Sequence, residues 1–199
     1  MNVITLHSGT WASLQSQRER LPHALLLVGQ RGLGKFALAR AFAKSLLCEQ
    51  LLNGGHFCGG CLACNWFEQE NHPDFRLLQP QAMAEEAGVE EGGKKASQQI
   101  TIDQVRALDD FFHVGTHRAG LKVIVINPVD AMNRNAANAL LKILEEPAPG
   151  TLFLMVSSEP LRLLPTIRSR CQLIPVGIPP TAVAEAELAA EGIKQPARW

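Results

Sequence analysis

The sequence lacks a long apolar run and a secretory leader. Its apolar runs, such as Leu25 to Val28, fall far short of the roughly 20 residues that a helix needs to span a bilayer. The N-terminus also lacks the charged-then-apolar pattern of a signal peptide. These two absences lead us to expect a cytoplasmic protein with no membrane partner.

Net charge is lacking as well. Lys plus Arg total 19 and Asp plus Glu total 19, so there is no global basic field that would draw the protein onto nucleic acid. Any contact with DNA is therefore expected to be local or shared with partner proteins.

Cysteine is scarce, but four of the five cysteines are clustered as C-x9-C-x2-C-x2-C: Cys48, Cys58, Cys61 and Cys64. A reducing compartment disfavours disulfides. Two overlapping C-x-x-C turns can place thiolates about 2.3 Å from a tetrahedral zinc ion. The pattern predicts a zinc-binding insertion at about residues 48–64, and a closed four-sulfur site is typical of structural zinc.

Three alternatives to this ligand set remain open. His56 could take one ligand position, or the thiols could be reduced and unligated, or form a redox pair. Cys171 stands apart from the cluster, and we expect it to be a small buried residue at the start of a strand.

Apolar strands alternate with amphipathic helices along the chain. Alternating strands and helices predict an α/β fold, a parallel sheet with helices on its faces. Strands are expected at 24–28, 74–78, 122–126, 152–156 and 172–176, and helices at 10–20, 36–47, 102–112, 134–146 and within 160–170.

Composition suggests one main domain, 1–177, followed by the start of a second, helical domain at 178–199. With 46% hydrophobic residues, the 199-residue chain can form one good core, and Pro179-Pro180 marks the boundary. Most of the polar stretch 79–99 is expected to be a mobile loop, and its Lys94-Lys95 pair is interpreted as a solubility feature.

A phosphate-binding loop follows the first strand. Gly29-x-x-x-x-Gly34-Lys35, with Gly32 between, fits the motif except that Phe36 replaces the usual Ser or Thr. The glycines let backbone N–H groups surround phosphates, the following helix offers its positive end, and Lys35 can reach the outer phosphates. The sequence predicts a nucleotide-binding site of degenerate form.

The residues that would hold magnesium are absent. Phe36 cannot ligate a cation, and the strand that should end in acids ends in Asn127-Pro128. Asp130 lies two residues past Pro128, poorly placed to substitute. We therefore expect weak ATP binding or none, and no hydrolysis. A tight strand-to-helix turn without nucleotide, and an active ATPase or nucleotide kinase, are the alternatives.

Several segments together resemble the clamp-loader subunits of bacterial DNA polymerase III, in the AAA+ superfamily. The resemblance covers about residues 20–180 and depends on His23–Gly29, the cysteine insertion, Asn138–Pro147 and Ile167–Cys171. It implies a zinc-bearing P-loop AAA+ domain in a hetero-pentameric ring with ATPase motor and clamp-opening subunits. That ring loads a sliding clamp onto primed DNA for a DNA-directed DNA polymerase. The family also has a collar domain, which is not found in these residues.

The resemblance also assigns roles to single residues. The arginine of Ser-Arg-Cys, here Arg170 rather than Arg168, reaches the ATP of a neighbouring subunit in this family. Ser157-Ser158 lies where the family has a polar sensor of phosphate. The roles of Glu145 and Glu146 stay open. A zinc-dependent interaction module without nucleotide chemistry is a third hypothesis, which would leave Ser-Arg-Cys unexplained.

Overall fold

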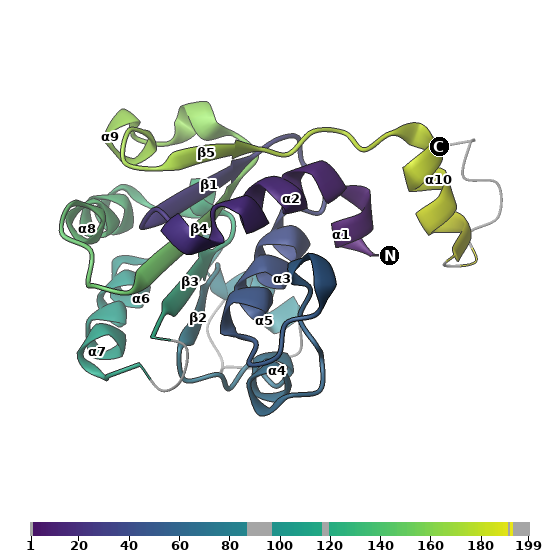
Figure 1. Cartoon of the computed structure of the whole chain (residues 1–199). Coiled ribbons are helices and arrows are strands. Elements are labelled where there is room, and N and C mark those ends of the chain that lie inside the picture. Colours follow the sequence, from purple (N-terminus) through teal and green to yellow (C-terminus); the bar gives the residue numbers. More distant parts are fainter. Residues whose placement is uncertain (1, 87–96, 117–119, 191, 193–199) are drawn as a thin grey trace.

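The structure is a computed structural model of the chain (Figure 1), and it describes residues 2–86, 97–116, 120–190 and 192. The Lys94-Lys95 pair and the C-terminal end of the expected second domain lie outside the described residues. In the described part, no helix is both long enough and apolar enough to cross a membrane.

A five-stranded sheet forms the centre of the molecule, with the strands in the order β2-β3-β4-β1-β5. Every neighbouring pair is parallel, as expected for strands that alternate with helices. The expected strands are confirmed, with ends that differ by at most one residue: β1 (Ala24–Val28), β2 (Phe75–Leu78), β3 (Lys122–Ile126), β4 (Thr151–Ser157) and β5 (Gln172–Pro175).

Helices cover both faces of the sheet, because side chains alternate between the faces along each strand. Leu25 and Leu27 pack with α2 (Ser8–Ser16), α3 (Lys35–Leu47) and α4 (Leu62–Glu68). Leu26 packs on the other face, with the helices on the α8 side of Figure 1. These are α6 (Ile102–Arg106), α7 (Leu108–His113), α8 (Arg134–Glu145) and α9 (Pro165–Arg168).

The expectation of one continuous helix at 102–112 is corrected. The segment 102–112 forms α6 and α7, which meet at Ala107, and the buried residues Val105, Leu108 and Phe111 recur every third position. A three-residue repeat fits a tighter turn than a continuous α-helix. Within 79–99, most of which is expected to be a mobile loop, Gln81–Glu86 form α5.

Short helical segments complete the described chain. They are α1 (Val3–Leu6), η1 (Arg18–Arg20), η2 (Asn53–Gly55), η3 (Val129–Ala131), η4 (Pro160–Arg162) and α10 (Thr181–Ala190). Helix α10 lies apart from the sheet, beside the N-terminus (Figure 1), and Glu187 accepts a hydrogen bond from the Asn2 backbone N–H at 2.6 Å.

Gly29 allows the phosphate-binding loop to leave β1 close to the end of β5. A Cβ at this position would lie 2.3 Å from the carbonyl oxygen of Val176. Gly29→Ala is therefore expected to lower the free energy of unfolding by about 1–3 kcal/mol through overpacking, measured by chemical denaturation. Gly177→Ala is the control, since its Cβ would meet nothing within 4 Å. Equal stability of both variants would contradict this packing.

Candidate functional site

The loop from Gly29 to Lys35 joins β1 to α3. Gly32 has φ of 88° and Gly34 has φ of 72°, a left-handed backbone that glycine adopts without the steric cost of a Cβ. Gly34 is the N-cap of α3 and has no side chain to cap it, so the first-turn N–H groups of this 13-residue helix keep their capacity to bind an anion.

Lys35 is bonded within its own loop. Its ammonium donates to the carbonyl oxygen of Gly29 at 2.9 Å, to that of Gln30, and to the Ser158 hydroxyl at 3.0 Å. The residue is only 4% exposed. Burial lowers the pKa of Lys35, and the charge of Asp130 acts in the opposite direction. A phosphate would have to replace these internal bonds to engage the lysine.

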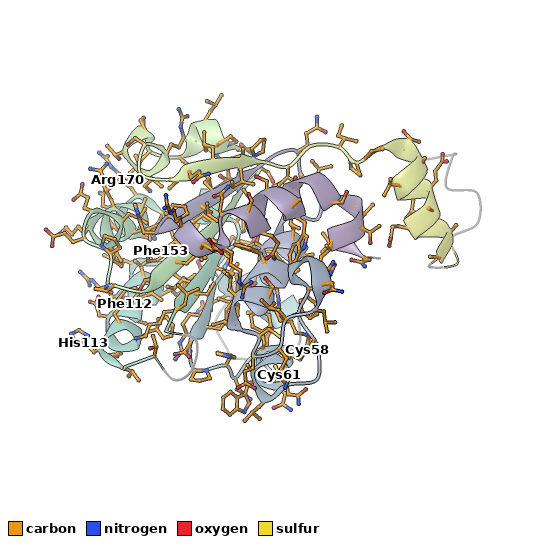
Figure 2. All side chains as sticks on the ribbon, in the orientation of Figure 1. Cys58, Cys61, Phe112, His113, Phe153 and Arg170 are labelled. Carbon is orange, nitrogen blue, oxygen red and sulfur yellow. The ribbon has the colours of Figure 1, made fainter. Side chains whose placement is uncertain are left out.

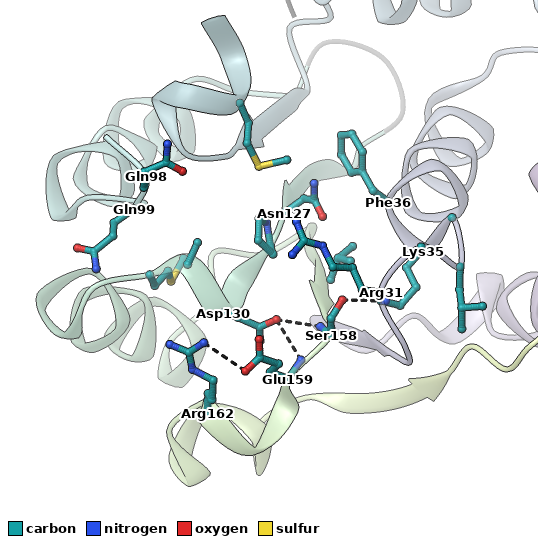
Figure 3. Close-up of a pocket in the computed structure, with 18 residues that line it drawn as sticks. Arg31, Lys35, Phe36, Gln98, Gln99, Asn127, Asp130, Ser158, Glu159 and Arg162 are labelled. Atoms are coloured by element: carbon teal, nitrogen blue, oxygen red, sulfur yellow. Dashed lines mark hydrogen bonds and ion pairs between the residues drawn. The ribbon is translucent and has the colours of Figure 1, made fainter. Parts of the chain in front are cut away.

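A cavity of about 580 Å³ opens beside the loop (Figure 3). It lies between the loop, the end of β3 and the segment after β4, and both Phe36 and Asn127 line it. The cavity wall thus carries an aromatic ring and an amide at the positions where a hydrolysing enzyme would have a hydroxyl and an acid. Arg31 and Arg162 also line it; our sequence analysis did not consider them.

Asp130, in η3, is held by the end of β4. Its carboxylate accepts hydrogen bonds from the Ser157 hydroxyl at 2.6 Å and from the backbone N–H groups of Ser158 at 2.8 Å and Glu159 at 3.2 Å. These bonds connect η3 to the strand that neighbours β1. The Ser157 hydroxyl therefore has the Asp130 carboxylate as its hydrogen-bond acceptor, and this carboxylate already accepts hydrogen bonds from three donors.

Arg170 lies close to α9 (Figure 2). Its guanidinium donates to a carboxylate oxygen of Glu145 at 2.8 Å and to the carbonyl oxygen of Thr166 at 2.9 Å. The side chain is 34% exposed, and Arg170 is not among the residues that line the cavity. Glu145, whose role the sequence left open, is thus the ion-pair partner of Arg170 on the surface.

The four clustered cysteines bring their sulfur atoms within 4.8 Å of one another. Cys48 lies 3.7 Å from Cys58 and 3.9 Å from Cys61, and Cys58 lies 4.0 Å from Cys64, measured between Sγ atoms. Ligands 2.3 Å from the centre of a tetrahedron are separated by about 3.8 Å. The donor set therefore fits a tetrahedral zinc ion.

Backbone N–H groups point at these sulfurs. Cys58 N–H donates to Cys48 Sγ, Cys61 N–H to Cys58 Sγ, and Cys64 N–H to Cys61 Sγ, over 3.3 to 3.4 Å. Burial acts to raise the pKa of Cys61, but hydrogen bonds from the N–H groups of Cys64 and Glu49 outweigh it and lower the pKa to about 6. Burial raises the pKa of Cys48 and Cys64 instead, so the N–H donors favour the thiolate, the form that binds metal, at Cys61.

Helix α2 holds the loop that carries this cluster. The indole N–H of Trp11 donates to the carbonyl oxygen of Gly54 at 3.0 Å, and the Gln15 amide donates to that of Gly55 at 3.2 Å. His56 packs on Trp11, with ring centroids 5.7 Å apart. Among the described residues, the group that could hold a metal ion consists of the four cysteines and does not include His56.

The sequence model of one family, described as DNA polymerase III, delta subunit, matches residues 8–178. The chain belongs to this family. The matched range contains the phosphate-binding loop, the four cysteines and Arg170, so every candidate site residue lies within it. The resemblance to DNA polymerase III clamp-loader subunits is confirmed at the level of the family.

Several relatives of this chain are named DNA polymerase III subunit delta'. The chain is 42% identical to that of Pseudomonas aeruginosa over 161 residues, which is 81% of this chain and 44% of the relative. It is 35% identical to that of Escherichia coli over 180 residues, 90% of this chain and 49% of the relative. The chain thus spans less than half the length of these relatives.

Solved structures show the same fold. A DNA polymerase III gamma subunit-related protein from Thermotoga maritima aligns with a TM-score of 0.61 at 20% identity, covering 90% of this chain and 49% of that one. A RuvB variant from Thermotoga maritima aligns with a TM-score of 0.50 at 12% identity, covering 94% and 50%. The parallel sheet with its flanking helices is therefore an arrangement that this family member shares with both.

Sequence reasoning did not find the residues that connect the parts of the site. Asp130 was considered only as a replacement acid, and Trp11 only as a residue within the amphipathic helix expected at 10–20. One signal was available for Trp11, because a tryptophan in a short helix that precedes a glycine-rich segment offers an N–H donor for a turn carbonyl. No sequence signal paired Arg170 with Glu145, which are 25 residues apart.

Proposed function

We propose that this chain is part of a clamp-loader subunit of DNA polymerase III, the delta' type, and that it does not hydrolyse ATP itself. In this role it joins ATPase motor and clamp-opening subunits in a hetero-pentameric ring that loads the sliding clamp onto primed DNA in the cytoplasm. The names of the relatives support the complex. Residues 1–177 form its AAA+ domain and 178–199 begin a helical lid.

The observation that carries the non-hydrolysing role is the chemistry of the cavity wall. Phe36 and Asn127 line it where a hydroxyl and an acid would coordinate magnesium. The nearby carboxylate of Asp130 already accepts three hydrogen bonds from Ser157, Ser158 and Glu159. Lys35 donates to its own loop. The loop then serves as a scaffold and binds ATP weakly or not at all through Gly29, Gly32, Gly34 and Lys35.

The purified protein is expected to show no magnesium-dependent ATP turnover, because neither ligand for the cation is present. Phosphate release is the measurement, and equilibrium dialysis with labelled ATP measures binding. Lys35→Ala is the control for contaminating ATPases. Turnover in the wild-type protein that disappears in Lys35→Ala would contradict the proposal and favour an ATP-hydrolysing motor subunit.

We propose a structural zinc ion for Cys48, Cys58, Cys61 and Cys64. Support comes from the sulfur separations of 3.7 to 4.0 Å and the N–H donors directed at three sulfurs. With four protein ligands no position is left for substrate. When bound, zinc would join α3, the 48–58 loop and α4 into one unit.

We further propose that Arg170 acts in trans on the ATP of a neighbouring subunit. It lies outside the cavity of its own chain, and its side chain is a third exposed. The ion pair with Glu145 presents the guanidinium at the surface, and a planar guanidinium stabilises the charge that develops on a transferred phosphoryl group. ATP hydrolysis by the reassembled complex with Arg170→Ala tests this role.

A further inference from the structure

The proposed zinc centre carries excess negative charge. Zinc with four thiolates has a formal charge of −2, because each deprotonated cysteine contributes −1 against the +2 of the ion. Three backbone N–H groups donate to its sulfurs, and such bonds offset part of this charge. A cation close to the cluster would offset more, since charges interact strongly where burial lowers the effective dielectric.

Helix α2 and the turn after it place one cation on the side that faces the cluster. Trp11, Gln15 and Arg18 follow at spacings of four and three residues, which puts them on one face of a helical segment. Trp11 and Gln15 donate to the carbonyl oxygens of Gly54 and Gly55, inside the loop between Cys48 and Cys58. Arg18 is the third member of this row, and its own hydrogen bond goes to the carbonyl oxygen of Ser45, three residues before Cys48.

The guanidinium of Arg18 lies at the end of α3. One of its nitrogens donates to the Ser45 carbonyl oxygen at 3.0 Å, in the last turn of the helix, and Cys48 is the C-cap of that helix. The other terminal nitrogen, Nη1, is buried and has no hydrogen-bond partner. Burial lowers the pKa of Arg18, and the charge of Cys48 acts to raise it, while burial raises the pKa of Cys48 itself.

Two other cations on this side of the sheet, Lys44 and Arg40, are already paired. Lys44 packs over the Phe57 ring, 4.3 Å from its centroid, and forms an ion pair with Glu68. Arg40 forms an ion pair with Glu70 at 3.0 Å. Among the described residues, Arg18 has no carboxylate partner within ion-pair distance. A half-buried guanidinium without a carboxylate is costly unless another anion lies near it.

We propose that Arg18 is the charge-compensating residue of the zinc centre, its guanidinium offsetting part of the net negative charge of zinc and the four thiolates. The inference rests on the proposed zinc site. Arg18 does not ligate the metal; it stabilises the loaded state from outside the ligand set, as hydrogen-bonding and charged neighbours of metal ligands do in general.

Three single variants separate charge from hydrogen bonding. Arg18→Gln removes the charge but keeps an N–H donor for the Ser45 carbonyl, and it is expected to weaken zinc binding by about 10–100-fold. Arg18→Lys keeps the charge and is expected to recover most of the affinity. Arg20→Gln removes an equal charge from an exposed residue two positions away and is expected to bind zinc as the wild type does. Competition with a chromophoric chelator measures the zinc affinity of each folded protein.

Each outcome decides a different question. Wild-type protein without one zinc per chain refutes the zinc site itself. Wild-type protein with one zinc, and Arg18→Gln that holds it equally tightly, refutes only the role of Arg18. Equal losses in Arg18→Gln and Arg20→Gln, or no recovery in Arg18→Lys, refute it too. If Arg18→Gln does not fold, Arg18→Met, which keeps the apolar stem, carries the same expectation of weakened binding.

Discussion

In a reassembled clamp-loader complex, Arg170→Ala is expected to lower ATP hydrolysis at the site that receives this arginine by about 10³-fold or more. A guanidinium stabilises the charge that spreads over the transferred phosphoryl group, and nothing on the alanine side chain replaces it. Total hydrolysis should fall by the share that this site contributes. The rate is measured with clamp and primed DNA present, because these stimulate the complex in the proposed cycle.

Two further variants identify the arginine and its chemistry. Arg168→Ala is the matched control, since its guanidinium donates to the Pro160 carbonyl oxygen at 3.4 Å and has no proposed role in trans. Arg170→Lys keeps the charge but loses the planar fork, so it should rescue little of the rate. Normal assembly with an unchanged rate in Arg170→Ala, or an equal loss in Arg168→Ala, would show that the proposed role is wrong.

Cys61→Ser is expected to reduce the zinc content from one ion per chain to none and to unfold the cysteine-bearing unit. Structural zinc contributes on the order of 10 kcal/mol of folding free energy in small zinc domains, and 48–64 has few large buried side chains to stabilise it otherwise. Elemental analysis measures the metal, and limited proteolysis between Cys48 and Glu68 reports the local unfolding.

Cys171→Ser provides the matched control for loss of a thiol. Cys171 donates to the Ile167 carbonyl oxygen at 2.9 Å, and burial raises its pKa to about 12, so it stays a thiol and takes no part in the cluster. This variant should keep one zinc per chain. Retention of zinc in Cys61→Ser, or its loss in Cys171→Ser, would contradict the proposed ligand set.

The sequence by itself determined the strands, the phosphate-binding loop and the cysteine cluster. Each depends on short-range information: an uninterrupted apolar run such as Val123 to Ile126 is typical of a strand buried on both faces. Two C-x-x-C turns place sulfurs together through local geometry, whatever the rest of the chain does. The missing hydroxyl at Phe36 and the missing acids at Asn127-Pro128 were equally visible, because the motif specifies residue types at set positions.

Contacts between distant segments were decided only by the tertiary structure. Asp130 meets Ser157 because β3 and β4 are neighbours in the sheet, and Arg170 meets Glu145 because α8 and α9 lie on the same face. Trp11 and Gln15 reach the loop between Cys48 and Cys58, and Arg18 reaches the end of α3, because α2 and α3 pack on one side of the sheet. Such contacts depend on how layers pack around a common core, and no local pattern of residues encodes that packing.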